Sequence, residues 1–134
     1  MRRFAFGLLT ALCLALPMGA AKADPVQETI LNQLEAFKAD DFATAFTFAS
    51  PSIKSIFMSA ENFGRMVRNG YPMVHRPGSV RMLEQREISG SLWQKVMITD
   101  QSGRTHVLDY QMIQTPDGWQ INGVQLLPEP GVGA

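Results

Sequence analysis

The chain has few of the residues on which several classes of protein depend. Its 134 residues include one cysteine and two histidines, and its 12 basic side chains equal its 12 acidic ones. One cysteine cannot form a disulfide framework, and balanced charge does not favour nucleic-acid binding, which needs a basic surface. The length allows one small domain and excludes a (β/α)₈ barrel, which needs about 250 residues.

Motifs for metal binding and for nucleophilic catalysis are also missing. His75 and His106 lie far apart, and no H-E-x-x-H or paired C-x-x-C spacing is present, so we expect no metal site. There is no G-x-S-x-G, S-x-x-K or glycine-rich phosphate loop. We therefore expect no cofactor, and nucleophilic and phosphoryl-transfer enzymes are not favoured.

Charge is absent from residues 4–21, which follow a basic start and end in Ala21-Lys22-Ala23. This layout is typical of a secretory signal peptide, so we expect cleavage after Ala23 and a periplasmic or secreted product. A retained anchor is the alternative, because the uncharged run approaches the roughly 18 residues that span a bilayer. Pro17 and Gly19 weaken that alternative, since they weaken the helix just before the cleavage site.

Cleavage changes the charge and the thiol content. The mature chain keeps 9 basic and 12 acidic residues, a net charge of −3, and it loses Cys13. Nucleic acid and anionic membrane surfaces are then poor partners, and we expect no stable membrane anchor. The remaining 111 residues must be held together by their core.

Helical patterns occupy the first half of the mature chain. Asp24-Pro25 is a helix start, and an apolar stripe follows at helical spacing: Val26, Ile30, Leu34 and Phe37. Asp40-Asp41 offers an end to this helix and an N-cap for a second one, which has Phe42, Ala45, Phe46 and Ala49 on one face. A third helix, at about residues 51–58, should bury Ile53, Ile56 and Phe57. A fourth begins near Ser59 and should close at a left-handed residue in Asn69-Gly70.

From Ser79 the apolar period changes to two, which predicts strands. Four are expected, at about residues 79–88, 91–99, 105–114 and 119–126, and their short connections require antiparallel neighbours. We predict an α+β fold in which N-terminal helices pack on a curved, cone-like meander of four strands. The expected organisation is a signal peptide (1–23), one domain (24–126) and an irregular tail (127–134).

The alternation also predicts the register of the central strands. Pairing Thr99 with Thr105 brings the apolar residues of both strands onto one face, and it sets Gln94 opposite Tyr110. We expect these two side chains to face the helices as a hydrogen-bonded polar pair. Gly123 interrupts the last strand and predicts a bulge that turns the following residues inward.

These residues resemble the bacterial family called domain of unknown function 4864. The resemblance covers nearly all of residues 26–126 and rests on motifs that occur in order: Gln33-Leu34-Glu35-Ala36-Phe37, Asp40-Asp41, Ala45-Phe46-Thr47-Phe48-Ala49-Ser50-Pro51-Ser52-Ile53, Met66-Val67, Tyr71-Pro72, Gln94, Val96, Asp100, Gly103, Tyr110, Met112, Gly118-Trp119, Ile121 and Gly123. The resemblance implies the nuclear transport factor 2-like superfold, in which helices close a curved sheet around a pocket. That superfold hosts enzymes and binding modules, so the resemblance implies no activity.

The leading hypothesis is a non-enzymatic binding module whose pocket takes a small apolar or amphipathic ligand or a protein partner. The pocket candidates are Gln94, Tyr110, His75 and Tyr71. Tyr110 and Gln94 are also explained as core residues, and His75 as a surface or packing residue.

Two other functions stay open. An acid–base enzyme of the isomerase or cyclase type would use Tyr110 and His75, although no acidic residue is expected beside Tyr110 on the inner face. A self-associating module would form a homodimer through an open sheet face that carries Trp93 and Met97. The arginines at positions 65, 68, 76, 81 and 86 fit a solvated face.

Overall fold

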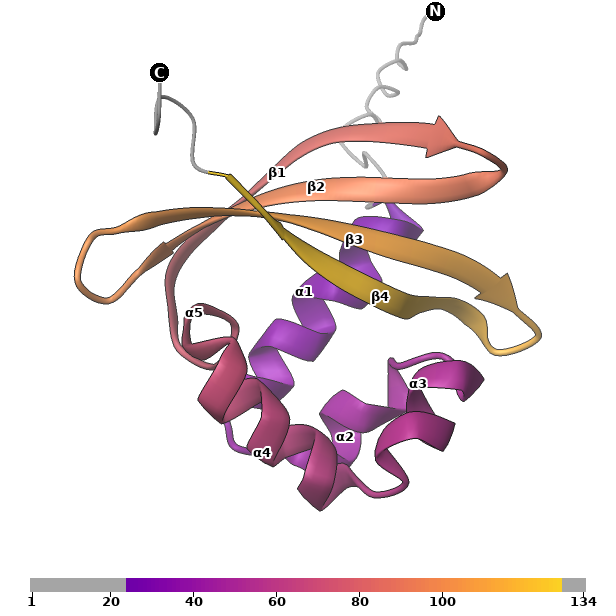
Figure 1. The fold of residues 1–134 in the computed structure, drawn as a ribbon, viewed down its shortest axis with the longest axis horizontal. Helices are drawn as coiled ribbons and strands as arrows, with labels where there is room; N and C mark the ends of the chain where they lie inside the picture. Colours follow the sequence, from indigo (N-terminus) through magenta and orange to yellow (C-terminus); the bar gives the residue numbers. More distant parts are fainter. Residues whose placement is uncertain (1–23, 129–134) are drawn as a thin grey trace, which may run out of the picture.

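Helices and strands occupy separate halves of the chain and form two layers (Figure 1). The computed structural model describes residues 24–128. Within them, five helices precede four strands: α1 (Pro25–Lys38), α2 (Phe42–Thr47), α3 (Pro51–Phe57), α4 (Ala60–Gly70), α5 (Pro72–His75), β1 (Pro77–Ile88), β2 (Ser91–Asp100), β3 (Thr105–Thr115) and β4 (Gly118–Leu127). The predicted α+β class is confirmed. The expected signal peptide and residues 129–134 of the expected tail lie outside the described residues.

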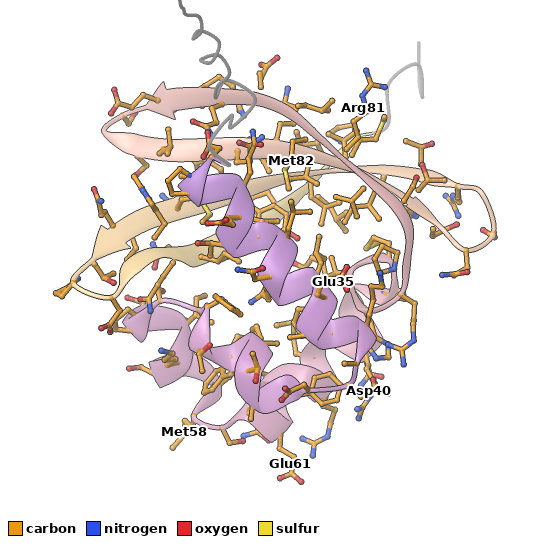
Figure 2. All side chains as sticks on the ribbon, turned by 180° about the vertical axis from the view of Figure 1, so that it is seen from behind. Glu35, Asp40, Met58, Glu61, Arg81 and Met82 are labelled. Atoms are coloured by element: carbon orange, nitrogen blue, oxygen red, sulfur yellow. The ribbon has the colours of Figure 1, made fainter. Side chains whose placement is uncertain are left out.

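The longest helix, α1, forms where the sequence predicts it. The Asp24 carboxylate accepts hydrogen bonds from the backbone N–H groups of Val26 and Gln27, at 2.8 and 3.3 Å, and so caps the helix. The predicted apolar stripe is buried. Figure 2 shows α1 lying across the inner face of the sheet, with side chains filling the space between the layers. The core is therefore shared by α1 and the inner face of the strands.

The strands form one antiparallel sheet in the order β1-β2-β3-β4, which is the predicted meander. The predicted register of β2 and β3 is confirmed: Thr99 pairs with Thr105, and Gln94 pairs with Tyr110. A bulge lies in β4, because consecutive residues of β3 pair with Gly123 and Ile121 and leave Asn122 as the extra residue. The predicted irregularity near Gly123 is thus confirmed.

The end of α4 differs from the prediction. Gly70 does not adopt a left-handed conformation but belongs to the helix, which ends at Tyr71 (φ −135°, ψ 60°). The physical reason is Pro72, whose ring disfavours helical backbone in the residue before it. Pro72 then occupies the first turn of α5, a short helix that the sequence pattern did not reveal.

The third helix is less buried than expected. None of its residues is fully buried, and Ile56 is 67% exposed. Ile53 and Phe57 are four residues apart and pack against the core, whereas Ile56 is not among the residues that do so. Ala49, expected on α2, follows the end of that helix and pairs with Ile121 of β4 through a parallel bridge.

Candidate functional site

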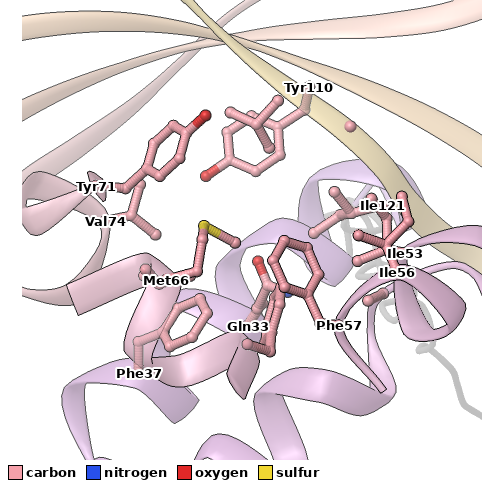
Figure 3. A pocket seen from close by; sticks show the side chains of 15 residues that line it. Gln33, Phe37, Ile53, Ile56, Phe57, Met66, Tyr71, Val74, Tyr110 and Ile121 are labelled. Carbon is pink, nitrogen blue, oxygen red and sulfur yellow. The ribbon is translucent and has the colours of Figure 1, made fainter. Parts of the chain in front are cut away.

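A pocket of about 450 Å³ lies between the helices and the inner face of the sheet (Figure 3). Ligand sites commonly measure about 300–1,000 Å³ and combine an apolar lining with a few polar groups. The lining consists of Gln33, Phe37, Ala49, Ile53, Ile56, Phe57, Phe63, Met66, Val67, Tyr71, Val74, Tyr110, Ile121, Gly123 and Val124. Three of these side chains are polar, and none carries a charge. The pocket is therefore suited to an apolar molecule.

One wall of the pocket is fixed where α3 meets the bulge of β4. The Ser50 backbone N–H donates to the Ile121 carbonyl at 2.8 Å. The Ser50 hydroxyl donates to the Asn122 side-chain oxygen at 2.7 Å and accepts from the N–H of Ile53 at 3.2 Å. Because Ser50 caps α3, the same residue starts the helix and attaches it to the sheet. The α3 side chains that line the pocket are positioned by this attachment.

Tyr110 reaches the pocket from β3, where alternate residues face the helices. Its side chain is 1% exposed, and its hydroxyl has no hydrogen-bond partner within the described residues. In Figure 3 the hydroxyl points away from the sheet, into the pocket. Burial raises the pKa of Tyr110 well above its usual value, and the nearby Tyr71 adds to the rise. The hydroxyl therefore stays protonated at neutral pH and can donate a hydrogen bond.

Gln94 does not satisfy that hydroxyl, so the expectation of a bonded Gln94–Tyr110 pair was wrong. The Gln94 amide nitrogen donates to the backbone carbonyls of Leu83 and Lys95, at 3.0 and 2.9 Å. Its oxygen accepts from the Gln27 side chain of α1 at 3.3 Å. Gln94 is fully buried, but it is not among the lining residues. The bulge of β1 between Met82 and Gln85 brings the Leu83 carbonyl within its reach.

Gln33 is a polar lining residue that the sequence analysis missed. Its amide nitrogen donates to the Ala45 carbonyl at 3.1 Å, which links α1 to α2. Its side-chain oxygen is turned toward the pocket in Figure 3. A signal was present, because Gln33 lies three residues after Ile30 and four before Phe37, on the apolar stripe of α1. A polar residue on such a face is a candidate for a buried polar role.

The other two candidates end up in different places. Tyr71 is half-buried and lines the pocket, as Tyr110 does. His75 is not a lining residue: its ring stacks on Phe42 and is 2.8 Å from the Asp40 carboxylate. The contacts with His75 and Arg76 hold the pKa of Asp40 below its usual range. The structure thus brings the two tyrosines together and keeps His75 outside the pocket.

Titratable groups elsewhere form ion pairs and small networks. His106 contacts the Asp100 carboxylate at 2.8 Å, and this contact, together with Ser102, holds the pKa of Asp100 far below its usual range. Among residues 24–128, no three His, Cys, Asp or Glu side chains are grouped closely enough to hold a metal ion. In the same range, no helix combines the length and apolar character needed to cross a bilayer.

The outer face of the sheet carries an ion pair beside its apolar residues. The Arg86 guanidinium donates two hydrogen bonds to the Asp109 carboxylate, at 2.9 and 2.8 Å. These bonds raise the pKa of Arg86. Trp93, which pairs with Arg86, and Met97 are both half-buried on this face. The residues singled out for self-association are thus partly covered within the chain.

The amino-acid sequence was compared with those of known protein families. The sequence model of a family described as a domain of unknown function (DUF4864) matches residues 20–134. The chain belongs to the DUF4864 family. No curated protein matches it. The family resemblance expected from the sequence motifs is confirmed, and the pocket with its two tyrosines is a feature of this DUF4864 domain.

Proposed function

We propose that this DUF4864 domain is a non-enzymatic, exported binding protein that holds a small apolar or amphipathic molecule in the pocket between its helices and its sheet. The observation that carries the proposal is a pocket of about 450 Å³ with no charged residue in its lining. Burial of a ligand against such a surface contributes about 25 cal/mol per Å² of apolar area. Transfer of an apolar molecule from water into this pocket therefore lowers the free energy.

The lining also favours binding over acid–base catalysis. A general base must lie within hydrogen-bonding distance of the proton that it removes. No lining residue is an Asp, Glu, His or Lys, and burial keeps the Tyr110 hydroxyl protonated at neutral pH, so it does not act as a base there. A binding role requires only the apolar walls and the few polar groups that are present.

Two further features support the proposal at the level of fold and location. Helices that cover one face of the sheet and leave a pocket beneath them support the part of the proposal that assigns the domain to the nuclear transport factor 2-like superfold. The basic start and the uncharged run of residues 4–21 support export to the periplasm or beyond. A ligand met after export would enter beside Ile56, which is 67% exposed and lines the pocket.

Native mass spectrometry of protein exported by its own N-terminal segment tests both parts of the proposal. The denatured mass should correspond to a chain that begins at Asp24, and the native mass should exceed it by that of one bound small molecule. Ile53→Trp, which enlarges a half-buried lining residue of α3, should abolish the added mass because the larger indole takes up space that the ligand would occupy.

Ser52→Trp is the matched control, because Ser52 is exposed on the same helix and does not line the pocket. It should keep the added mass. An added mass that survives Ile53→Trp would place the ligand elsewhere. Absence of any added mass, together with no binding of 2-ethylnaphthalene in a titration, would contradict the proposed binding role.

A further inference from the structure

The polar groups of the pocket differ in how much hydrogen-bonding capacity they have left. The Gln33 amide nitrogen is engaged with the Ala45 carbonyl at 3.1 Å. Tyr71 is half-buried, so part of its side chain reaches solvent. The Tyr110 hydroxyl is the buried side-chain atom without a partner among the described residues. Tyr110 is therefore the hydrogen-bond donor of this pocket that a ligand could satisfy with the greatest gain.

The strands beside Tyr110 supply no hydrogen-bond partner for its hydroxyl among residues 24–128. The residue opposite it on β2, Gln94, uses its nitrogen on two backbone carbonyls and its oxygen on Gln27. Val124 faces Tyr110 from β4 and has no polar side-chain atom. A buried hydroxyl without a partner lowers the stability of the folded state, because it has lost its hydrogen bonds to water. An unpaired hydroxyl at the wall of an apolar pocket is a site at which a bound molecule can supply the missing hydrogen-bond acceptor.

We propose that the ligand of this pocket carries a neutral hydrogen-bond acceptor, such as a ketone, aldehyde or ester carbonyl, and that the Tyr110 hydroxyl donates to it. This inference rests on the proposed binding function and adds the chemical class of the ligand to it. The acceptor is neutral because no lining residue supplies a positive charge, and an unpaired carboxylate is far more costly than a carbonyl to bury in apolar surroundings.

The size of the pocket limits the rest of the molecule. At the packing density of a protein interior, about 0.74, a pocket of this volume accepts a molecule of roughly 300 Å³. The walls opposite Tyr110 are Met66, Phe57 and other apolar side chains of the helices (Figure 3). The ligand is therefore expected to have one acceptor at the sheet end and a hydrocarbon body that extends between the helices.

Three naphthalenes of similar shape test this class directly. They are 2-acetylnaphthalene, which has a neutral acceptor, 2-ethylnaphthalene, which has none, and 2-naphthoate, which has an anionic one. Calorimetric or fluorescence titrations of the mature protein should give 2-acetylnaphthalene a Kd about threefold to tenfold below that of 2-ethylnaphthalene, as one neutral hydrogen bond implies. The 2-naphthoate should bind more weakly than both.

Tyr110→Phe removes the hydroxyl and leaves the ring. It should bring the Kd of 2-acetylnaphthalene up to that of 2-ethylnaphthalene and leave the latter unchanged. Tyr71→Phe makes the same chemical change in the other lining tyrosine, and the preference should be lost in Tyr110→Phe only. Ser52→Ala is the control, because it removes a hydroxyl from an exposed residue outside the pocket, and it should leave the binding of all three probes unchanged. The retained binding of 2-ethylnaphthalene also shows that each variant is folded.

The outcomes separate this inference from the proposed function. Equal binding of 2-acetylnaphthalene and 2-ethylnaphthalene to the unaltered protein would overturn the assignment of Tyr110 while keeping the binding pocket. Loss of the preference in Tyr71→Phe but not in Tyr110→Phe would overturn it as well, and tighter binding of 2-naphthoate would overturn the neutral acceptor. Failure of all three probes to bind would contradict the proposed function itself.

Discussion

At the scale of single residues, Gln94 and Tyr110 at the centre of the sheet differ in whether their polar groups have hydrogen-bond partners. Gln94 and Tyr110 are paired across β2 and β3 and are equally buried, at 0% and 1% exposure. Gln94 has partners for both ends of its amide, whereas the Tyr110 hydroxyl has none within the described chain. Burial of Gln94 therefore stabilises the fold, and burial of the Tyr110 hydroxyl costs stability.

This difference predicts that Tyr110→Phe stabilises the ligand-free protein. Removal of an unsatisfied hydroxyl should raise the free energy of unfolding by about 1 kcal/mol, because the phenylalanine ring keeps the packing and loses the desolvation cost. Urea unfolding followed by tryptophan fluorescence measures the change. Tyr71→Phe should alter stability by less than about 0.5 kcal/mol. A clear loss of stability in Tyr110→Phe would show that the hydroxyl has a partner in solution.

At the scale of elements, α3 is held at its ends more than along its length. None of its residues is fully buried. Its start is tied to β4 through Ser50, which is 0% exposed. Beyond its end, Met58 adopts a left-handed conformation (φ 72°), and the Asn62 amide donates to the Phe57 carbonyl at 2.9 Å. The helix thus depends on its caps for its position over the pocket.

The dependence on caps predicts a marked effect of Ser50→Ala. The variant loses the cap of α3 and the partly buried hydrogen bond to Asn122, and its free energy of unfolding should fall by about 1–2 kcal/mol. Amide hydrogen exchange in α3 should also accelerate. Ser52→Ala, in the exposed first turn of the same helix, should change stability by less than about 0.5 kcal/mol. Equal effects of the two substitutions would contradict this account of α3.

At the scale of the whole molecule, carboxylate contacts hold the ends of the two layers. Asp40, after α1, contacts His75 and Arg76 at the junction of α5 and the sheet. Asp100 accepts from the Ser102 and Arg104 N–H groups, both at 2.9 Å, in the turn between β2 and β3. In both residues these contacts hold the pKa below the usual value. Each carboxylate therefore stabilises the folded state in its ionised form.

The lowered pKa values set the sign of the pH dependence. A carboxyl group with a lowered pKa in the folded state binds protons less readily there than in the unfolded chain, so stability falls as the pH drops below the ordinary Asp value of about 3.9. We expect stability to be highest at neutral pH and to decrease steeply from about pH 4 downward. Unfolding by urea at a series of pH values measures this profile.

Asp100→Asn separates the contribution of that carboxylate. It should be less stable than the unaltered protein at pH 7, and the difference should shrink as the pH falls through the range in which Asp100 becomes protonated. Asp117→Asn, in the exposed turn between β3 and β4, is the matched control and should run parallel to the unaltered protein. A constant difference between the Asp100 variant and the unaltered protein at all pH values would contradict the predicted linkage.

The sequence by itself determined the features that depend on near neighbours. Local hydrogen bonding determined the cap at Asp24. An apolar period of two determined the four strands and the register that sets Gln94 opposite Tyr110. Both signals depend on residues that are close together in the sequence. Tertiary structure alone decided that Ile56 is exposed, that His75 contacts Asp40 and that Gln94 bonds to Leu83 rather than Tyr110. A pocket is the volume that distant elements leave unfilled, so it arises only when α1, α3, α4 and the bulged β4 have packed together.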